Sequence, residues 1–262
     1  YQAADRGITV FVTTHYMDEA EYCNRVSIMV DGRIEALDTP KNLKYQFKAE
    51  SMEESGKKEA IERTAKELFI QSVHQTAELI AEQLYSRYQY QRTALARQFP
   101  FMMGNDVWKG GGKLAPNDQV GDVLRQGTLG IGFIGGHNAM MALYGESHGH
   151  SRKAWDTLYE AVLEMNKVAD DYKAKYQLNF SVLATPAEGL SGRFTRMDRR
   201  KYGTIPGVTD NDYYVNSFHV DVKESITIVD KIKREAPFHA ITRGGHITYV
   251  ELDGEAQKNI KA

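Results

Sequence analysis

The stretch that decides the fold is VLATPAEGLSG, residues 182–192. It opens inside NFSVLA (residues 179–184), which is predicted to be a strand. The run continues into Thr185-Pro186-Ala187-Glu188, where a Thr cap, a first-position Pro and an early acid predict the start of a helix. A strand that leads into a helix is the building unit of α/β proteins. We therefore predict an α/β fold with a partly parallel sheet or barrel.

The same strand-to-helix junction predicts a site for an anion. The first N–H groups of a helix have no intrahelical partners and lie at the positive end of its dipole. Ala184, Ala187 and Gly189 are small enough for a phosphate to approach the backbone, and Thr185 and Ser191 add hydroxyl donors. On these residues alone, a plain capped helix is the simpler interpretation.

Charged residues accompany this junction. Glu188 is interpreted as the acid of the first helical turn, with a polar group of the site as the alternative. A basic cluster follows, which can neutralise a triphosphate but is equally typical of a solvated face. The cluster consists of Arg193, Arg196, Arg199, Arg200 and Lys201.

Helical and strand patterns alternate along the rest of the chain. Amphipathic helices are predicted over residues 59–98 and over residues 151–175, where Ser151 is the expected N-cap. The other predicted strands are 8–13, 25–30, 33–37, 130–134, 213–222 and 247–252, and the other predicted helices are 18–23, 40–47, 137–144 and 226–235. Asp31-Gly32 predicts a hairpin turn, and the polar residues 50–58, with Gly56, predict a linker.

Composition limits the function classes. Of the 262 residues, 42% are hydrophobic and 26% charged, and the formal net charge is −2. With this net charge the chain has no overall positive field that would attract nucleic acid. No apolar run approaches the roughly 20 residues that span a bilayer. We therefore expect a cytoplasmic protein without membrane insertion or direct nucleic-acid binding. The single cysteine, Cys23, excludes an intrachain disulfide, and the first residue, Tyr1, indicates a fragment.

Five stretches of the C-terminal part resemble the class III, oxygen-sensitive ribonucleoside-triphosphate reductases. They are FPFMMGNDVW (99–108), GTLGIGFIGGHNAMMALYG (127–145), LNFSVLATPAEGLSGRFTRMDRRKYG (178–203), IPGVTDNDYYVNSFHV (205–220) and EAPFHAITRGGHITYVELDG (235–254). The resemblance implies part of the ten-stranded α/β barrel shared with other glycyl-radical enzymes. It also implies that the substrate's phosphates are held by Thr185, Pro186, Ala187, Glu188, Gly189 and Ser191.

The resemblance further implies anaerobic reduction of ribonucleoside triphosphates to deoxyribonucleoside triphosphates. In that family a glycyl radical oxidises a cysteine to a thiyl radical, formate supplies reducing equivalents, and a zinc site is structural. A radical-SAM activating enzyme is the implied partner, and a homodimer is compatible with the resemblance. The thiyl cysteine lies upstream of the matching stretch, and the glycyl loop and zinc module lie downstream. We therefore predict no catalytic residue, metal ligand or cofactor site in this chain, and expect it to be inactive alone.

The N-terminal run ITVFVTTHYMDEAEYCNRVSIMVDGRIEALDTP, residues 8–40, closely resembles the end of the nucleotide-binding domain of ABC transporters. In that family a strand carries a switch histidine to the γ-phosphate of ATP, and His15 stands at this position. No P-loop GxxxxGK[ST] occurs, so we predict that His15 is vestigial and that the chain does not hydrolyse ATP. The predicted domains are 1–51 (ABC ATPase fragment), 52–58 (junction) and 59–262 (reductase barrel fragment).

Two other functions stay open: a non-catalytic nucleotide-binding protein that keeps the phosphate site, and a fragment of an ABC transporter ATP-binding protein. His148 and His150 have the spacing of a metal pair but no third ligand, so a turn is the preferred interpretation. The remaining histidines of the C-terminal part are interpreted as packing residues; they are His137, His219, His239 and His246. Asn216, Ser217 and His219 are further candidates for the site.

Overall fold

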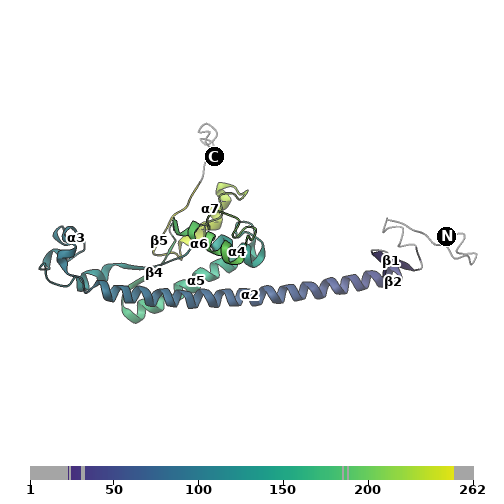
Figure 1. Cartoon of the computed structure of the whole chain (residues 1–262), viewed down its shortest axis with the longest axis horizontal. Coiled ribbons are helices and arrows are strands. Elements are labelled where there is room, and N and C mark those ends of the chain that lie inside the picture. Colours follow the sequence, from purple (N-terminus) through teal and green to yellow (C-terminus); the bar gives the residue numbers. More distant parts are fainter. Residues whose placement is uncertain (1–22, 24, 31–32, 185, 188, 251–262) are drawn as a thin grey trace, which may run out of the picture. The chain divides into compact units, whose positions relative to one another are not determined.

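The computed structural model describes residues 23, 25–30, 33–184, 186–187 and 189–250. The chain divides into two compact units, an N-terminal unit, Tyr1–Arg63, and a C-terminal unit, Thr64–Ala262. Helix α2 (Pro40–Gln91) contributes residues to both (Figure 1). Among the described residues, no helix combines the length and the apolar character needed to cross a membrane.

The N-terminal unit contains a hairpin of two antiparallel strands, β1 (Val26–Val30) and β2 (Arg33–Asp38). Their pairing runs from Val26 opposite Asp38 to Val30 opposite Arg33, which confirms the two strands predicted there. The predicted turn at residues 31–32, the predicted strand over 8–13 and His15 lie outside the described residues.

Helix α2 continues through residues 50–58, where the sequence predicts a linker. Gly56 costs only about 1 kcal/mol relative to Ala in a helix, and the Glu, Lys and Ala residues around it favour helix. The boundary between the compact units lies after Arg63. The predicted junction between the two family-like segments, residues 52–58, therefore stays a prediction. These residues lie within α2.

The C-terminal unit is built on a parallel sheet with the order β3-β4-β5. Its strands are β3 (Thr128–Gly132), β4 (Asn179–Ala184) and β5 (Gly245–His246). Thr128 pairs with Asn179 at one end of β3–β4, and Gly132 pairs with Leu183 at the other. The prediction of an α/β fold with a parallel sheet is confirmed, and the bounds of β4 are those predicted.

Helices connect these strands and cover the sheet (Figure 1). Ser151 accepts a hydrogen bond from the backbone N–H of Ala154, which confirms it as the N-cap of the longest connecting helix. The main helices are α4 (Gly136–Tyr144), α5 (Arg152–Tyr176), α6 (Gly189–Tyr202) and α7 (Ile228–His239). Shorter ones are η2 (Ala96–Gln98), α3 (Pro100–Gly104), η3 (Gly111–Lys113) and η4 (Gly121–Gln126).

The core of this unit lies between β4 and α5. Phe180, Val182 and Ala184 alternate along β4 and are buried, and they share one apolar cluster with Val162 and Leu158 of α5. Burying a side chain such as Phe or Val contributes about 1.5–3 kcal/mol relative to leaving it exposed. This packing fixes β4, and with it the junction at its C-terminal end.

The part of α2 within this unit packs along α5 in the same direction. Lys66 forms an ion pair of 2.6 Å with Glu160 near the start of α5. Further along both helices, the hydroxyl of Tyr172 donates to Glu82 over 2.7 Å. The two helices therefore lie side by side, and α5 shares its apolar cluster with β4.

Residues 213–222, predicted as a strand, form no ladder, so that prediction is wrong. Their backbone groups bond to scattered partners: Gly135 N–H donates to the Val215 carbonyl (2.7 Å), and Val215 N–H donates to Asn138 Oδ1 (2.9 Å). Only Asn216 forms an isolated bridge in this segment, with Ile134. The segment is a buried loop, termed here the crossing loop (residues 213–221). Of the predicted strand over 247–252, the described residues 247–250 form no strand, and β5 ends before them at His246.

Replacing Gly136 with alanine is expected to destabilise the C-terminal unit by about 1–3 kcal/mol, the usual cost of overpacking. A Cβ at Gly136 would lie 2.5 Å from the carbonyl oxygen of Ser217 and 3.0 Å from Leu158. Urea unfolding followed by tryptophan fluorescence measures the change. Gly104→Ala is the matched control, because a Cβ there meets nothing within 4 Å. Equal stability of the two variants would show that the close approach at Gly136 is relieved without cost.

Candidate functional site

The strand-to-helix junction lies between Ala184, the last residue of β4, and Gly189, the first residue of α6. Pro186 is exposed, Ala187 is half-buried and Ser191 is buried. Helix α6 therefore begins three residues after Pro186, and the prediction of Pro186 at the first helical position is wrong. Thr185 and Glu188 lie outside the described residues, so the predicted cap and acid stay predictions.

A side chain from the crossing loop holds the chain just before α6. The backbone N–H of Ala187 donates to Oδ1 of Asn216 over 3.0 Å. The Ala187 carbonyl then accepts from the N–H of Leu190 over 3.0 Å, which turns the chain into the helix. Ala187 is thus held by a residue about thirty positions away, a partner that local sequence patterns do not reveal.

The crossing loop lies at the C-terminal ends of β3 and β4. Just after β3, Gly136 N–H donates to the Ser217 carbonyl (3.1 Å), and the Ser217 hydroxyl donates to the Phe133 carbonyl (3.2 Å). Just after β4, Asn216 holds Ala187. Ligands of open parallel sheets bind outside the carboxyl ends of the strands, which is where this loop and the start of α6 come together.

The basic cluster of α6 divides into two kinds of residue. Arg199 is half-buried, and its guanidinium donates to the carbonyl oxygens of Thr209 and Asn211 at 2.5 Å each. Arg199 therefore holds the segment that precedes the crossing loop. The members of the predicted cluster that are exposed are Arg193, Arg196, Arg200 and Lys201.

The guanidinium of Arg196 reaches back to the first turn of α6. If Gly192, the fourth residue of α6, carried a Cβ, that atom would lie 3.3 Å from Nη1 of Arg196. Helical side chains lean toward the N-terminus of their helix, which accounts for this reach. An exposed guanidinium thus stands close to the helix start.

A buried polar cluster anchors the far side of the crossing loop on α7. Lys231 forms an ion pair with Glu235, and its Nζ also donates to the Val220 carbonyl over 3.1 Å. Glu235 accepts the N–H of Val220 over 2.9 Å, and its second oxygen lies 3.7 Å from Nδ1 of His219. Burial raises the pKa of the Glu235 carboxyl, but the nearby His219 ring and the hydrogen bonds from Lys231 and Val220 lower that pKa below its ordinary value. The lowered pKa favours the ionised form of Glu235, and no local sequence pattern indicated this cluster.

A buried histidine supports the same loop from within the fold. His148 is fully buried, and its Nε2 donates to the carbonyl of Phe218 over 2.8 Å. Burial lowers its pKa to about 4. His150, by contrast, is exposed and pairs with Glu224 at 2.9 Å. His148 and His150 thus have separate partners, in agreement with a structural turn.

The other four histidines, predicted to be packing residues, differ in burial: His239 is half-buried, and His246 is exposed, against that prediction. His137 and His219 are buried, and the rings of His239 and His246 stack with centroids 4.0 Å apart. Within the described part of the chain, no three His, Cys, Asp or Glu side chains are placed so that they could hold a metal ion.

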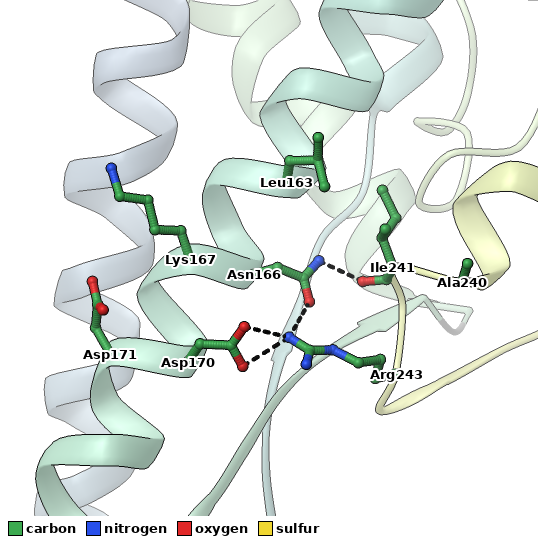
Figure 2. Close-up of a pocket in the computed structure, with 8 residues that line it drawn as sticks. All are labelled: Leu163, Asn166, Lys167, Asp170, Asp171, Ala240, Ile241 and Arg243. Carbon is green, nitrogen blue, oxygen red and sulfur yellow. Dashed lines mark hydrogen bonds and ion pairs between the residues drawn. The ribbon is translucent and has the colours of Figure 1, made fainter.

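A hollow of about 460 Å³ lies on another part of this unit, between α5 and residues 240–243 (Figure 2). Arg243 reaches across it and donates to both carboxylate oxygens of Asp170 at 2.8 Å and to Oδ1 of Asn166 at 3.1 Å. The residues of the strand-to-helix junction do not line it. Asp170 pairs with Arg243, and Lys167, the other cation that lines the hollow, lies 3.5 Å from Glu164, so each positive charge in the hollow has a carboxylate partner.

Residues 57–262 match the family model described as anaerobic ribonucleoside-triphosphate reductase. The enzyme of that name from Escherichia coli (strain K12) is 36% identical over 155 residues, which cover 58% of this chain and 22% of the enzyme. The enzyme from Enterobacteria phage T4 is 34% identical over 195 residues, which cover 74% of this chain and 30% of the enzyme. The chain spans less than a third of the length of these relatives.

A shorter similarity connects the chain to ABC transporter ATPases. A probable multidrug ABC transporter ATP-binding protein of Escherichia coli (strain K12) is 41% identical over 70 residues, 27% of this chain and 11% of that protein. A fluoroquinolones export ATP-binding protein of Mycobacterium tuberculosis (strain H37Rv) is 60% identical over 40 residues, 15% of this chain and 13% of that protein. Both resemblances expected from the sequence are confirmed.

Solved structures share the fold of the C-terminal part. The anaerobic ribonucleotide reductase from Thermotoga maritima with glycerol in its active site has a TM-score of 0.52 at 15% identity, over 77% of this chain and 31% of that chain. The same enzyme with MES in its active site has a TM-score of 0.51 at 15% identity, over 77% and 33%. At this identity the likeness concerns the fold alone.

Proposed function

Because the chain belongs to the anaerobic ribonucleoside-triphosphate reductase family, we propose that it holds the phosphates of a ribonucleoside triphosphate at the start of α6. The observation that carries this proposal is the position of that helix start at the carboxyl edge of the parallel sheet. The proposed site keeps the predicted residues Thr185, Pro186, Ala187, Glu188, Gly189 and Ser191.

The chemistry of the helix start supports this proposal. Gly189 is exposed, and a Cβ built on it meets nothing within 4 Å, so an anion can approach the backbone there. The N–H of Leu190 already donates to the Ala187 carbonyl, so the donors proposed for the phosphates are the other N–H groups of the first turn of α6, and the exposed guanidinium of Arg196 adds a positive charge close by. Ser191 is only 6% exposed, so its hydroxyl is proposed to support the site from within the first turn of α6.

The proposed reaction is the anaerobic reduction of the bound ribonucleotide, and residues 59–262 are proposed to form part of a ten-stranded α/β barrel. The sites of the glycyl radical, formate and zinc are proposed to lie outside this chain's residues, so no step is assigned to it beyond binding and orienting the substrate. Its one cysteine, Cys23, precedes the stretch that matches the family. A radical-SAM activating enzyme is the proposed partner of the whole enzyme, and a homodimer its proposed assembly.

A second candidate is a nucleotide-binding protein without any reductase role. It shares the phosphate site, so binding alone does not separate the two candidates. A reconstitution under strict anoxia separates them, in which this chain is combined with the activating enzyme and with the parts of a related reductase that this chain does not cover. Deoxynucleotide formation that depends on this chain supports the reductase. Deoxynucleotide formed by the purified chain alone would contradict the proposal that it only binds. An ABC-type role requires ATP binding that is lost in His15→Ala.

Gly189→Asp is expected to weaken the binding of ribonucleoside triphosphates by at least about 10-fold, because a carboxylate beside a phosphate costs more than about 1.4 kcal/mol near a protein surface. Isothermal titration calorimetry with each of the four ribonucleoside triphosphates measures this. The thermal midpoint is expected to be retained, since an acid is favourable in the first turn of a helix.

Gly104→Asp is the matched control, because Gly104 also has open space around it but lies at the end of α3. It is expected to bind like the unmodified chain. A folded, unmodified chain that gives no heat with any of the four triphosphates would remove the proposed function.

A further inference from the structure

We propose that Asn216 is a phosphate ligand of this site and takes the place of the Ala187 backbone N–H. The inference rests on the proposed function and deepens it. Ala187 is among the predicted phosphate-binding residues, but its N–H is already donated to Oδ1 of Asn216 at 3.0 Å. A hydrogen-bond donor for an anion at this position must therefore come from a group other than the Ala187 N–H.

The hydrogen bond to Ala187 settles the orientation of the Asn216 carboxamide. A backbone N–H can only donate, so the atom that receives it must be the amide oxygen. The carboxamide is planar, and fixing its oxygen also fixes its NH₂ group beside Ala187. Nδ2 donates no hydrogen bond to any described residue, whereas Oδ1 is occupied. Asn216 is half-buried, so this NH₂ group is accessible from solvent.

The loop around Asn216 is held on both sides, which gives the NH₂ group a fixed position. Before it, the Val215 carbonyl accepts from Gly135 N–H at 2.7 Å. After it, Ser217 has a left-handed backbone with φ of 46°, and its carbonyl accepts from Gly136 N–H at 3.1 Å. A donor held in this way binds an anion without first losing much conformational freedom.

Two substitutions of Asn216 distinguish a phosphate ligand from a residue that only anchors the loop. Asn216→Asp keeps an oxygen that accepts from Ala187 N–H but replaces the NH₂ donor with a second, negatively charged oxygen. Asn216→Ala removes both. The matched control is Asn179→Asp, because Asn179 is exposed and lies at the opposite end of β4.

The experiment is calorimetry with ribonucleoside triphosphates and with inorganic tripolyphosphate, alongside the thermal midpoint of each variant. We expect Asn216→Asp to weaken binding of both probes by at least about 10-fold, the loss typical of a hydrogen bond to a charged group, with its midpoint retained. Asn216→Ala is expected to weaken binding and to lower the midpoint. Asn179→Asp is expected to change neither.

The outcomes distinguish this inference from the proposed function. Binding by the unmodified chain together with unchanged affinity in Asn216→Asp would leave the function standing and overturn the role of Asn216. A parallel loss of affinity and midpoint in Asn216→Asp would also overturn it, because that result indicates an anchoring residue alone. No binding by the folded, unmodified chain would overturn both.

Discussion

Lys231→Met is expected to destabilise the C-terminal unit by about 3–5 kcal/mol, because it leaves the buried carboxylate of Glu235 without its ion-pair partner. Lys231 also donates to the Val220 carbonyl, which would lose this hydrogen bond. A loss of this size is a large fraction of the stability of an ordinary domain.

Urea unfolding followed by tryptophan fluorescence tests this expectation. Trp155 of α5 donates its indole N–H to the Arg234 carbonyl of α7 at 2.8 Å, so its emission reports on the contact of these two helices. Lys233→Met is the matched control on the same helix, because Lys233 is exposed. The stability of this variant is expected to differ little from that of the unmodified chain. The double variant Lys231→Met/Glu235→Met is expected to recover part of the loss. A single variant as stable as the control would mean that Glu235 is not ionised in the folded protein.

The pH dependence of stability is expected to carry a large contribution from His148. Burial lowers the pKa of this imidazole to about 4, and its ordinary value is 6.5. Below pH 6.5 the unfolded chain binds a proton that the folded chain does not, so the contribution of His148 to stability is present above pH 6.5 and is lost toward pH 4. At about 1.4 kcal/mol per pKa unit, the loss amounts to about 3 kcal/mol.

The measurement is the unfolding free energy at several pH values between 7 and 4 for the unmodified chain and for His148→Gln. The glutamine amide can still donate to the Phe218 carbonyl but does not titrate. The variant is expected to lose stability less steeply on acidification, whatever its stability at pH 7. His150→Gln, with its exposed side chain, is expected to keep the steep dependence. Identical slopes for His148→Gln and the unmodified chain would contradict a neutral, buried imidazole.

Local signals in the sequence predicted those parts of the fold that are held locally. The apolar run NFSVLA predicted β4 to the residue, and Ser151 predicted the start of α5 within one residue. These predictions succeed because a strand that packs on α5 needs apolar side chains on its core face, here Phe180, Val182 and Ala184, and an N-cap needs a side-chain oxygen.

The failures share a different cause, which is that their partners are distant in sequence. Val215 and Val220 are buried and fall in an apolar segment that resembles a strand, but their backbone groups bond to α4 and α7. Lys231 and Glu235 have the i, i+4 spacing of an exposed helical pair, and only the crossing loop above them makes them buried. The role of Asn216 in holding Ala187 likewise depends on a contact that no local pattern indicates.

The close approach of Gly136 and Ser217 has a consequence for how related sequences diverge. The Ser217 carbonyl occupies the space of a side chain at position 136, and this carbonyl is directed there by a left-handed backbone. A mutation that adds a side chain at 136 can become tolerable once position 217 changes its backbone conformation, for instance through glycine. Evolution is therefore expected to keep the pair together or replace it together, so covariation between the two positions would be a signature of this packing in any lineage that retains the loop.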